Sequence, residues 1–231
     1  MAELEAENAW LRRELADAEH RGKRLRGELQ HRVRNLLAVI RSIARRTALA
    51  SETAEDYAMH FEGRLGAIAR AQAMVMRNPA DCVDLGEMVA EELLAHAAHE
   101  GEQVSLSGPA IRLLGKAAET IALAVHELAA NAVKYGALSG SRGHIAVTWG
   151  VEQKNAQSGD AGQVLRLEWR ETGVPLRSLP SRRKGFGTEL IERTLAYELG
   201  ATGSLGFGHD GVRCTVVVPL ADEVATPGEC P

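Results

Sequence analysis

Residues 126–139 read HELAANAVKYGALS, and this stretch organises the rest of the chain. An apolar face with helical spacing runs into it, which predicts a buried helix over 116–137. The face comprises Ile121, Leu123, Ala124, Leu128, Ala129, Ala132 and Val133. Four polar residues interrupt this apolar run: His126, Glu127, Asn131 and Lys134. The stretch is therefore a buried helix with polar groups placed along it.

Glu127 and Asn131 are the informative pair, because they lie four residues apart. A carboxylate and a carboxamide then project from one side of the helix, about one turn apart. Such oxygens can orient water and complete the shell of a Mg²⁺ ion that takes its other ligands from phosphates. The alternative is an ordinary surface helix with its polar residues on the wet face. Spacing alone does not separate the two interpretations.

Composition limits the classes of function. The chain has 231 residues, 45% of them hydrophobic, which is enough for one or two domains. A net charge of −4 gives no general case for nucleic-acid binding. Three cysteines are scattered without metal-ligand or disulfide spacing, as in a reducing compartment. No apolar run approaches the roughly 20 residues of a membrane span, and no signal peptide opens the chain. We therefore expect a cytoplasmic protein without a membrane segment.

The first 28 residues predict a coiled-coil signalling helix. Their apolar positions alternate in steps of four and three. The seam consists of Leu4, Asn8, Leu11, Leu15, Ala18, Gly22, Leu25 and Leu29. So narrow a stripe needs a partner helix, so we expect a homodimer.

After Leu29 two steps of four fall together, which is a stutter that locally unwinds a supercoil. His31 follows it on the opposite side of the helix, so we expect this side chain to face water. Asn35 lies one turn further on, and Arg32 and Arg34 flank the histidine. An exposed histidine is usually only a surface residue. Placed among cations, a neutral imidazole is a candidate nucleophile for a phosphoryl group.

A second amphipathic helix is expected after a turn at 48–53. Thr53, three residues before Asp56, resembles a capping box. The helix should end at Asn78-Pro79, because proline cannot continue it. Residues 29–78 then form an antiparallel helical hairpin, and two copies make a four-helix bundle. We place a domain boundary at 78/79.

Residues 79–220 predict a two-layer α/β sandwich, which makes the whole chain α+β. We expect helices at 85–99, 116–137 and 188–199. Strands are expected at 103–107, 111–114, 144–151, 164–171, 203–207 and 212–219, with a polar loop over 152–162. The last two strands form a hairpin around His209-Asp210-Gly211. Residues 221–231 are expected to be a disordered tail.

A third chemical segment spans 169–189, WRETGVPLRSLPSRRKGFGTE. It leaves a strand, passes through a Gly/Pro/Arg-rich loop and enters a helix at Gly185, Phe186, Gly187 and Thr188. Glycines let backbone N–H groups approach phosphate, and a helix N-terminus adds positive potential. A plain flexible loop is the alternative, since a lone GFGT is weak evidence.

Four motifs in this order resemble the HWE-type sensor histidine kinases. They are ELQHRVRNLLAVIRSIA at 28–44, HELAANAVKYGALS at 126–139, the Trp169-x-Glu171 pair and GFGTELI at 185–191. The resemblance covers roughly residues 27–219. It implies a dimerisation and phosphoacceptor hairpin followed by a GHKL-type ATP-binding domain. It also implies phosphorylation of His31 from ATP, with Asn35 beside it, and transfer to an aspartate of a response-regulator receiver domain.

The resemblance assigns roles within the ATP-binding domain. Asn131 would bind Mg²⁺, Glu127 would act near the metal or its water, and Glu171 would read the adenine amino group. The family takes its name from a histidine and a Trp-x-Glu pair, which match His126, Trp169 and Glu171 here. The remaining nucleotide contacts would be Lys134, Tyr135, Gly173, Arg183, Lys184, Gly185, Phe186, Gly187 and Thr188.

Three departures qualify what carries over. Arg32 follows the histidine where many histidine kinases have an acidic base, so the base is open, with Glu28 or Glu127 as candidates. Val174 stands where a second lid glycine is expected. No recognisable sensor domain precedes the coiled coil, so we expect an upstream sensor domain or a sensory partner. Two other functions stay open: a phosphotransfer scaffold with an inactive nucleotide site, and a GHKL-type serine kinase or ATPase.

Overall fold

The computed structural model describes residues 1–78, 82–96, 103–153, 162–174, 186–208, 211–220 and 224–225. Within these ranges the side chains of residues 2–6, 9, 25, 28, 32 and 225 are not described. The chain divides into two compact units, Met1–Leu49 and Ala50–Pro231. Each unit is treated by itself below.

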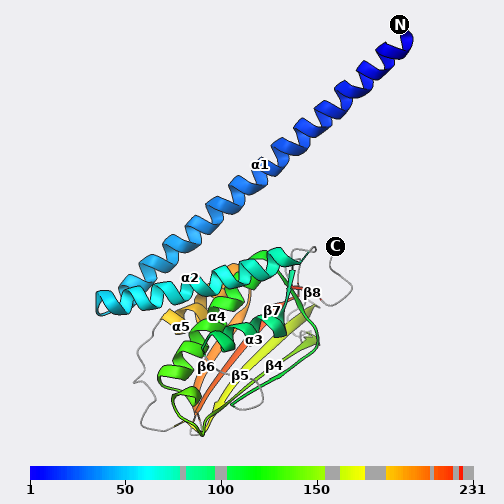
Figure 1. The fold of residues 1–231 in the computed structure, drawn as a ribbon. Helices are drawn as coiled ribbons and strands as arrows, with labels where there is room; N and C mark the ends of the chain where they lie inside the picture. The colour runs from blue at the N-terminus through cyan, green and yellow to red at the C-terminus, as the bar shows by residue number, and fades with distance from the viewer. Residues whose placement is uncertain are drawn as a thin grey trace. The chain divides into compact units, whose positions relative to one another are not determined.

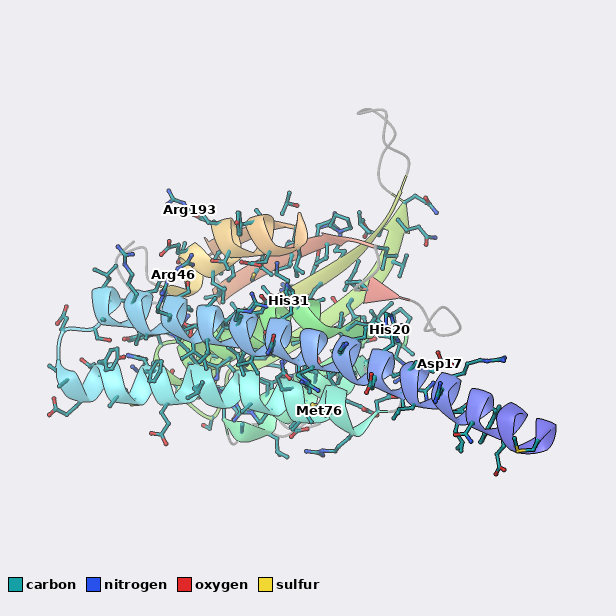
Figure 2. The ribbon with its side chains drawn as sticks, turned by 90° about the horizontal axis from the view of Figure 1, so that it is seen from above. Asp17, His20, His31, Arg46, Met76 and Arg193 are labelled. Atoms are coloured by element: carbon teal, nitrogen blue, oxygen red, sulfur yellow. The ribbon has the colours of Figure 1, made fainter. Side chains whose placement is uncertain are left out.

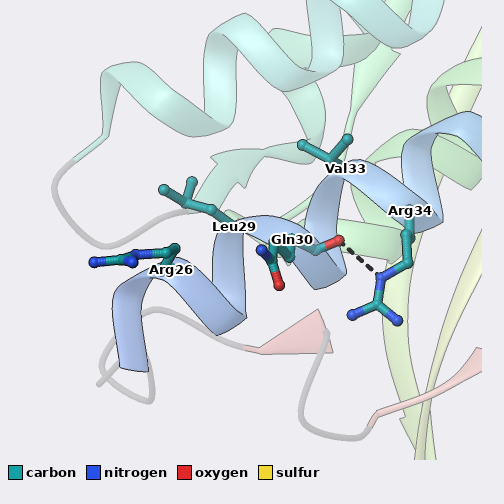
Figure 3. A pocket seen from close by; sticks show the side chains of 5 residues that line it. All are labelled: Arg26, Leu29, Gln30, Val33 and Arg34. Atoms are coloured by element: carbon teal, nitrogen blue, oxygen red, sulfur yellow. Dashed lines mark hydrogen bonds between the residues drawn. The ribbon is translucent and has the colours of Figure 1, made fainter. Parts of the chain in front are cut away.

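The first unit is one long helix, α1 (Ala2–Ala50), which continues three residues into the expected turn. Its predicted seam is largely open to solvent: Leu11, Leu15 and Leu29 are more than half exposed. Leu29 and Val33 lie next to one another on the helix, flanked by Arg26 and Arg34 (Figure 3). This apolar stripe has nothing from its own helix to cover it. That fits the expected helix partner, although the dimer remains a prediction.

The second unit opens with α2 (Ala54–Arg77), whose N-cap is Thr53 as expected. The Thr53 hydroxyl accepts a hydrogen bond from the Asp56 N–H at 3.0 Å. One face of α2 is buried, including Ala67, Ile68 and Ala71, and α2 packs against the long helix α4. The structure therefore divides at 49/50, and the expected boundary at 78/79 instead falls inside the second unit. The antiparallel pairing of the first two helices remains a prediction.

The described residues of the second unit contain a mixed five-stranded sheet in the order β2-β4-β5-β7-β6. Its strands are β2 (Val104–Ser107), β4 (His144–Gln153), β5 (Gln163–Thr172), β6 (Thr202–Gly208) and β7 (Gly211–Pro219). β2 runs parallel to β4, and the other neighbours are antiparallel. All five were expected, within two residues at each end. The alternation of apolar and polar residues predicts these strands, because every second residue of a strand faces the core.

Helices cover one face of this sheet (Figure 1). They are α3 (Leu85–Ala95), α4 (Gly115–Lys134), and the continuous segment α5 (Phe186–Glu189), η4 (Leu190–Thr194) and α6 (Leu195–Leu199). Ile121 of α4 and Leu195 of α6 meet Leu165 of β5 and Val216 of β7 across the interface. The two-layer sandwich predicted from the sequence is therefore correct.

Several details differ from expectation. A small antiparallel sheet, β1-β3-β8, joins Cys82–Asp84, Arg112–Leu114 and Val224–Ala225. β1 was not expected. The prediction of a disordered tail is wrong at β8, where Val224 is buried and pairs with β3. Residues 221–223 and 226–231 lie outside the described residues.

The helix predicted over 116–137 is also shorter than expected. It ends at Lys134 and is followed by a 3₁₀ turn, η1 (Ala137–Ser139). Val133, assigned to the core, is 40% exposed. Within the described ranges, no helix is both long and apolar enough to cross a membrane.

Candidate nucleotide site

A cavity of about 390 Å³ opens beside the C-terminal half of α4, entirely within the second unit. Pockets of this size suit small-molecule ligands. The sequence-predicted residues that line it are His126, Glu127, Asn131, Lys134, Tyr135, Glu171, Phe186, Gly187 and Thr188. Residues 126–135, the end of β5 and the start of α5 are therefore brought together, although they lie far apart in the sequence.

Gly187 permits the close contact between α5 and α4. A Cβ added there would stand 3.3 Å from Glu127 Cβ and 3.4 Å from Asn131 Nδ2. The first turn of α5 thus lies directly over the polar pair of α4. Asn131 is exposed toward the cavity, so its carboxamide is open to a ligand.

Glu127 is held by a residue that sequence reasoning does not single out. Arg64 of α2 donates from Nε to Glu127 Oε1 at 2.7 Å and from Nη2 to Oε2 at 3.1 Å. Both side chains are buried, and the Arg64 guanidinium lies 3.8 Å over the Phe186 ring. Such a bidentate pair is the strongest form of arginine–carboxylate contact. Each Glu127 oxygen keeps a further lone pair, so the carboxylate can still accept from a metal-bound water while Arg64 compensates its charge.

Lys134 is similarly engaged by α2. Its Nζ lies 2.8 Å from His60 Nε2. Burial lowers the pKa of His60, and the charges of Lys134 and Arg64 lower it further. The neutral ring can therefore accept a hydrogen bond from the ammonium group. The α2 region thus contributes three residues to the cavity wall, namely His60, Arg64 and, just before the helix, Ser51.

Glu171 forms the inner wall of the cavity at the end of β5. Its Oε1 accepts from Trp169 Nε1 at 3.0 Å, and its Oε2 accepts from the Ala137 N–H at 2.8 Å. Gly136 is required beside it, because a Cβ there would lie 2.0 Å from Oε2. Burial raises the pKa of Glu171, although the two hydrogen bonds oppose the shift. The tryptophan and the glutamate therefore act together, with Trp169 fixing the carboxylate from behind.

His126 turns its Nδ1 away from the expected nucleotide contacts. That atom lies 2.7 Å from Glu92 Oε1 and 3.2 Å from His96 Nε2. Glu92 is also bound by Arg70, with Nη2 at 2.7 Å from Oε1 and Nε at 3.0 Å from Oε2. Burial, followed by the charge of His126, lowers the pKa of His96.

In the first unit, His31 lies on the exposed surface of α1, as expected (Figure 2). Its Nδ1 lies 3.3 Å from Asn35 Nδ2, one turn along the helix. If the amide donates, Nδ1 is the acceptor and Nε2 carries the ring proton. In the other tautomer Nδ1 carries the proton, and Nε2 has the free lone pair that a nucleophile needs.

Comparison with known proteins points the same way as the site. Residues 28–110 match the model of the family described as HWE histidine kinase. The blue-light-activated histidine kinase of Brucella ovis is 30% identical over 197 residues, which cover 85% of this chain and 39% of the relative. The protein of the same description from Brucella anthropi is 30% identical over 200 residues, with the same coverage. This chain belongs to the HWE histidine kinase family.

The chain spans about two fifths of the length of these curated relatives. The solved structure of the Erythrobacter litoralis EL346 blue-light activated histidine kinase shares the fold. Its TM-score is 0.51 at 20% identity, over 85% of this chain and 63% of that chain. The two-layer domain of this chain thus has the same fold as the corresponding part of that kinase.

Not every predicted contact is found at the cavity. Arg183, Lys184 and Gly185 lie outside the described residues. Gly173 has a positive φ of 69° and is not among the described residues that line the cavity. Val174, which stands where a second lid glycine was expected, is buried.

The cavity and its surroundings also depend on residues that sequence reasoning misses. They are His60, Arg64, Arg70, Glu92 and His96. Only the i, i+4 spacing of Glu92 and His96 offered a local signal.

Proposed function

We propose that this chain phosphorylates His31 from ATP and passes the phosphoryl group to an aspartate of a response-regulator receiver domain. One observation carries the proposal: a single cavity brings Asn131, Glu171 and the Phe186–Thr188 turn together. The family membership supports the same activity. Neither observation identifies the receiver.

The cavity residues fit a Mg²⁺-bound purine nucleotide. Glu171 offers carboxylate lone pairs at the buried end, which suits an exocyclic amino group that donates. Asn131 offers an exposed carboxamide oxygen, the type of ligand that Mg²⁺ uses alongside phosphate oxygens. Bound ATP and Mg²⁺ would supply the γ-phosphoryl group and neutralise the charge that builds on it. The start of the helical segment that begins at α5 faces the same space and favours phosphate.

The phosphorylation step asks mainly for positioning. A bond forms between His31 Nε2 and the γ-phosphorus as the bond to the bridging oxygen breaks, and that oxygen leaves with the electron pair. The attacking Nε2 must hold its lone pair, so the ring proton must lie on Nδ1, where the Asn35 amide oxygen can accept it, and a base takes that proton as the bond forms. His31 belongs to the first unit and the cavity to the second, so the two must meet. They could do so within one chain or between the two chains of a dimer.

The Arg64–Glu127 pair bears on which base takes that proton. Arg64 donates to both Glu127 oxygens, so the carboxylate would have only its remaining lone pairs for that proton. The side chain of Glu28, the other candidate, lies outside the described residues. The base therefore stays open within the proposal.

The decisive experiment incubates the full chain with γ-labelled ATP and Mg²⁺. Wild type should acquire label that is lost in acid and kept in base, as phosphohistidine is. His31→Ala should abolish the label, and Asn131→Ala should reduce both the label and the affinity for ATP. His20→Ala is the matched control, because His20 is also an exposed histidine of α1 (Figure 2).

Other outcomes would redirect the proposal. Acid-stable label would indicate a serine or threonine acceptor, which is the alternative of a GHKL-type serine kinase. Absence of ATP binding in wild type would indicate a phosphotransfer scaffold. When a receiver domain is added to the labelled protein, the proposal expects the label to appear on the receiver. Loss of label from the protein without its appearance on the receiver would contradict the second half of the proposal.

A further inference from the structure

Three side chains of the second unit converge behind the nucleotide cavity in a pattern that the proposed kinase activity does not use. Glu92 lies on α3, His96 caps the C-terminus of that helix, and His126 lies on α4. Glu92 Oε1, His96 Nε2 and His126 Nδ1 all lie within 4.8 Å of one another. Glu92 and His126 are buried, and the His96 side chain is 18% exposed.

We propose that Glu92, His96 and His126 bind a Zn²⁺ ion, with water in the fourth position. Two imidazoles and a carboxylate are the ligand types that Zn²⁺ uses in three-ligand sites. Mg²⁺ prefers oxygen ligands and near-octahedral geometry, so this site differs from the one expected at Asn131.

The spacing of the three atoms suits such an ion. Their mutual distances are 2.7, 3.2 and 3.8 Å. Zinc lies about 2.0–2.2 Å from nitrogen and oxygen ligands, which places neighbouring ligands in a tetrahedron about 3.3 Å apart. The three observed distances fall on either side of that value. Side-chain shifts of about half an ångström would therefore bring all three atoms to bonding distance.

The surroundings also resemble a metal site. Arg70 donates to both Glu92 oxygens and so holds the carboxylate: Nη2 lies 2.7 Å from Oε1 and 2.8 Å from Oε2, and Nε lies 3.0 Å from Oε2. Ligating carboxylates are commonly held by such a second interaction. Gly63 of α2 leaves the space that the His126 ring occupies, since a Cβ there would lie 2.9 Å from its Nε2. The partly exposed His96 supplies the open side through which an ion and its water could enter.

A hydrogen-bonded cluster without metal is the competing explanation. His126 Nδ1 lies within reach of both Glu92 and His96, so a single ring proton would serve two neighbours. The arginine also compensates part of the carboxylate charge that would attract a cation. The two explanations differ in one measurable respect, because a proton-sharing cluster has no stoichiometric affinity for a transition metal.

The test uses the full chain without a histidine tag, treated with EDTA and then dialysed. Co²⁺ is titrated first, because its visible absorption reports coordination number, and Zn²⁺ is then added to displace it. We expect one equivalent of Co²⁺ with the intense bands of a four-coordinate site, and their loss on adding one equivalent of Zn²⁺. Zn²⁺ should also raise the melting temperature.

His96→Asn is the decisive variant, since it removes a ligand that is partly exposed and lies outside the proposed nucleotide contacts. It should weaken Zn²⁺ binding at least tenfold. His20→Asn on α1 is the matched control and should bind as wild type does. Glu92→Gln, which keeps the shape of the carboxylate, should also weaken binding, and circular dichroism verifies that each variant is folded.

Two results would overturn the site. One is wild type that binds no stoichiometric Co²⁺ or gives only the weak bands of six-coordinate surface sites. The other is a folded His96→Asn protein that binds Zn²⁺ as tightly as wild type. Because the readout is metal binding, neither result depends on whether the chain phosphorylates His31.

Discussion

Replacement of Glu171 by glutamine gives the sharpest test of how the buried end of the nucleotide cavity is held. Its two carboxylate oxygens accept from two different donors, Trp169 Nε1 and the Ala137 N–H. A glutamine of the same shape has only one oxygen, and its NH₂ group is a donor. One of the two N–H groups would then face another donor inside the protein.

The magnitude follows from that single conflict. Glu171 is 3% exposed, so water does not replace the lost acceptor. Leaving a buried donor unsatisfied costs about 1–3 kcal/mol. With a urea slope of about 2 kcal/mol per M, a loss of about 2 kcal/mol lowers the unfolding midpoint by about 1 M. Urea unfolding followed by circular dichroism measures this shift at pH 7.

A double-mutant cycle shows whether the mechanism is right. In a Trp169→Phe background the Ala137 N–H is the remaining partner, and the single oxygen of the introduced glutamine can accept from it. Glu171→Gln should then cost about 1 kcal/mol less than it does in wild type. Glu152→Gln is the matched control, because Glu152 pairs with Arg166 on the exposed surface and should change stability by less than about 0.5 kcal/mol. A Glu171→Gln protein as stable as wild type, or strictly additive mutations, would refute the reasoning.

Three further predictions follow. Burial raises the pKa of Glu171 above its ordinary 4.5, so the stability that its proton contributes is complete below pH 4.5 and is lost as pH rises through the raised pKa. The stability difference between wild type and Glu171→Gln should therefore widen from pH 7 to pH 5 in urea unfolding; a constant difference contradicts the shift. Gly136→Ala places a Cβ 2.0 Å from Glu171 Oε2 and 2.7 Å from Ala132 Cα. It should lower stability by about 1–3 kcal/mol in a thermal melt. Gly140→Ala, whose Cβ would have nothing within 4 Å, should not lower it. Cys214 is 1% exposed and burial raises its pKa to about 12, so iodoacetamide at pH 8 should label it only after unfolding, as mass spectrometry would show.

Much of the fold was predictable because it rests on short-range periodicity. The strands β4, β5 and β7 alternate clearly between apolar and polar residues, and the structure follows them within two residues. Thr53 was identifiable as an N-cap from its spacing to Asp56 alone. The expectation that 126–135 meets the start of α5 came from the family resemblance, and both line one cavity.

The missed features are short or depend on hydrogen-bond geometry. β1 and β8 have three and two residues, too few to display a period. Residues 190–194 form π-type turns within a stretch that reads as an ordinary helix, because an i→i+5 bond leaves no mark in hydrophobic spacing. The apolar face of α2 fits a helical hairpin as well as it fits a contact with α4, so the sequence alone did not distinguish the two.

The sequence by itself determined the longer helices and the five strands of the main sheet, and which residues could carry phosphoryl chemistry. Only the tertiary structure decided the partners of those residues. Arg64 meets Glu127 across 63 positions, and His126 meets Glu92 across 34. The reason is physical: helical spacing determines the direction of a side chain from its own axis, whereas its contacts depend on how separate helices pack together.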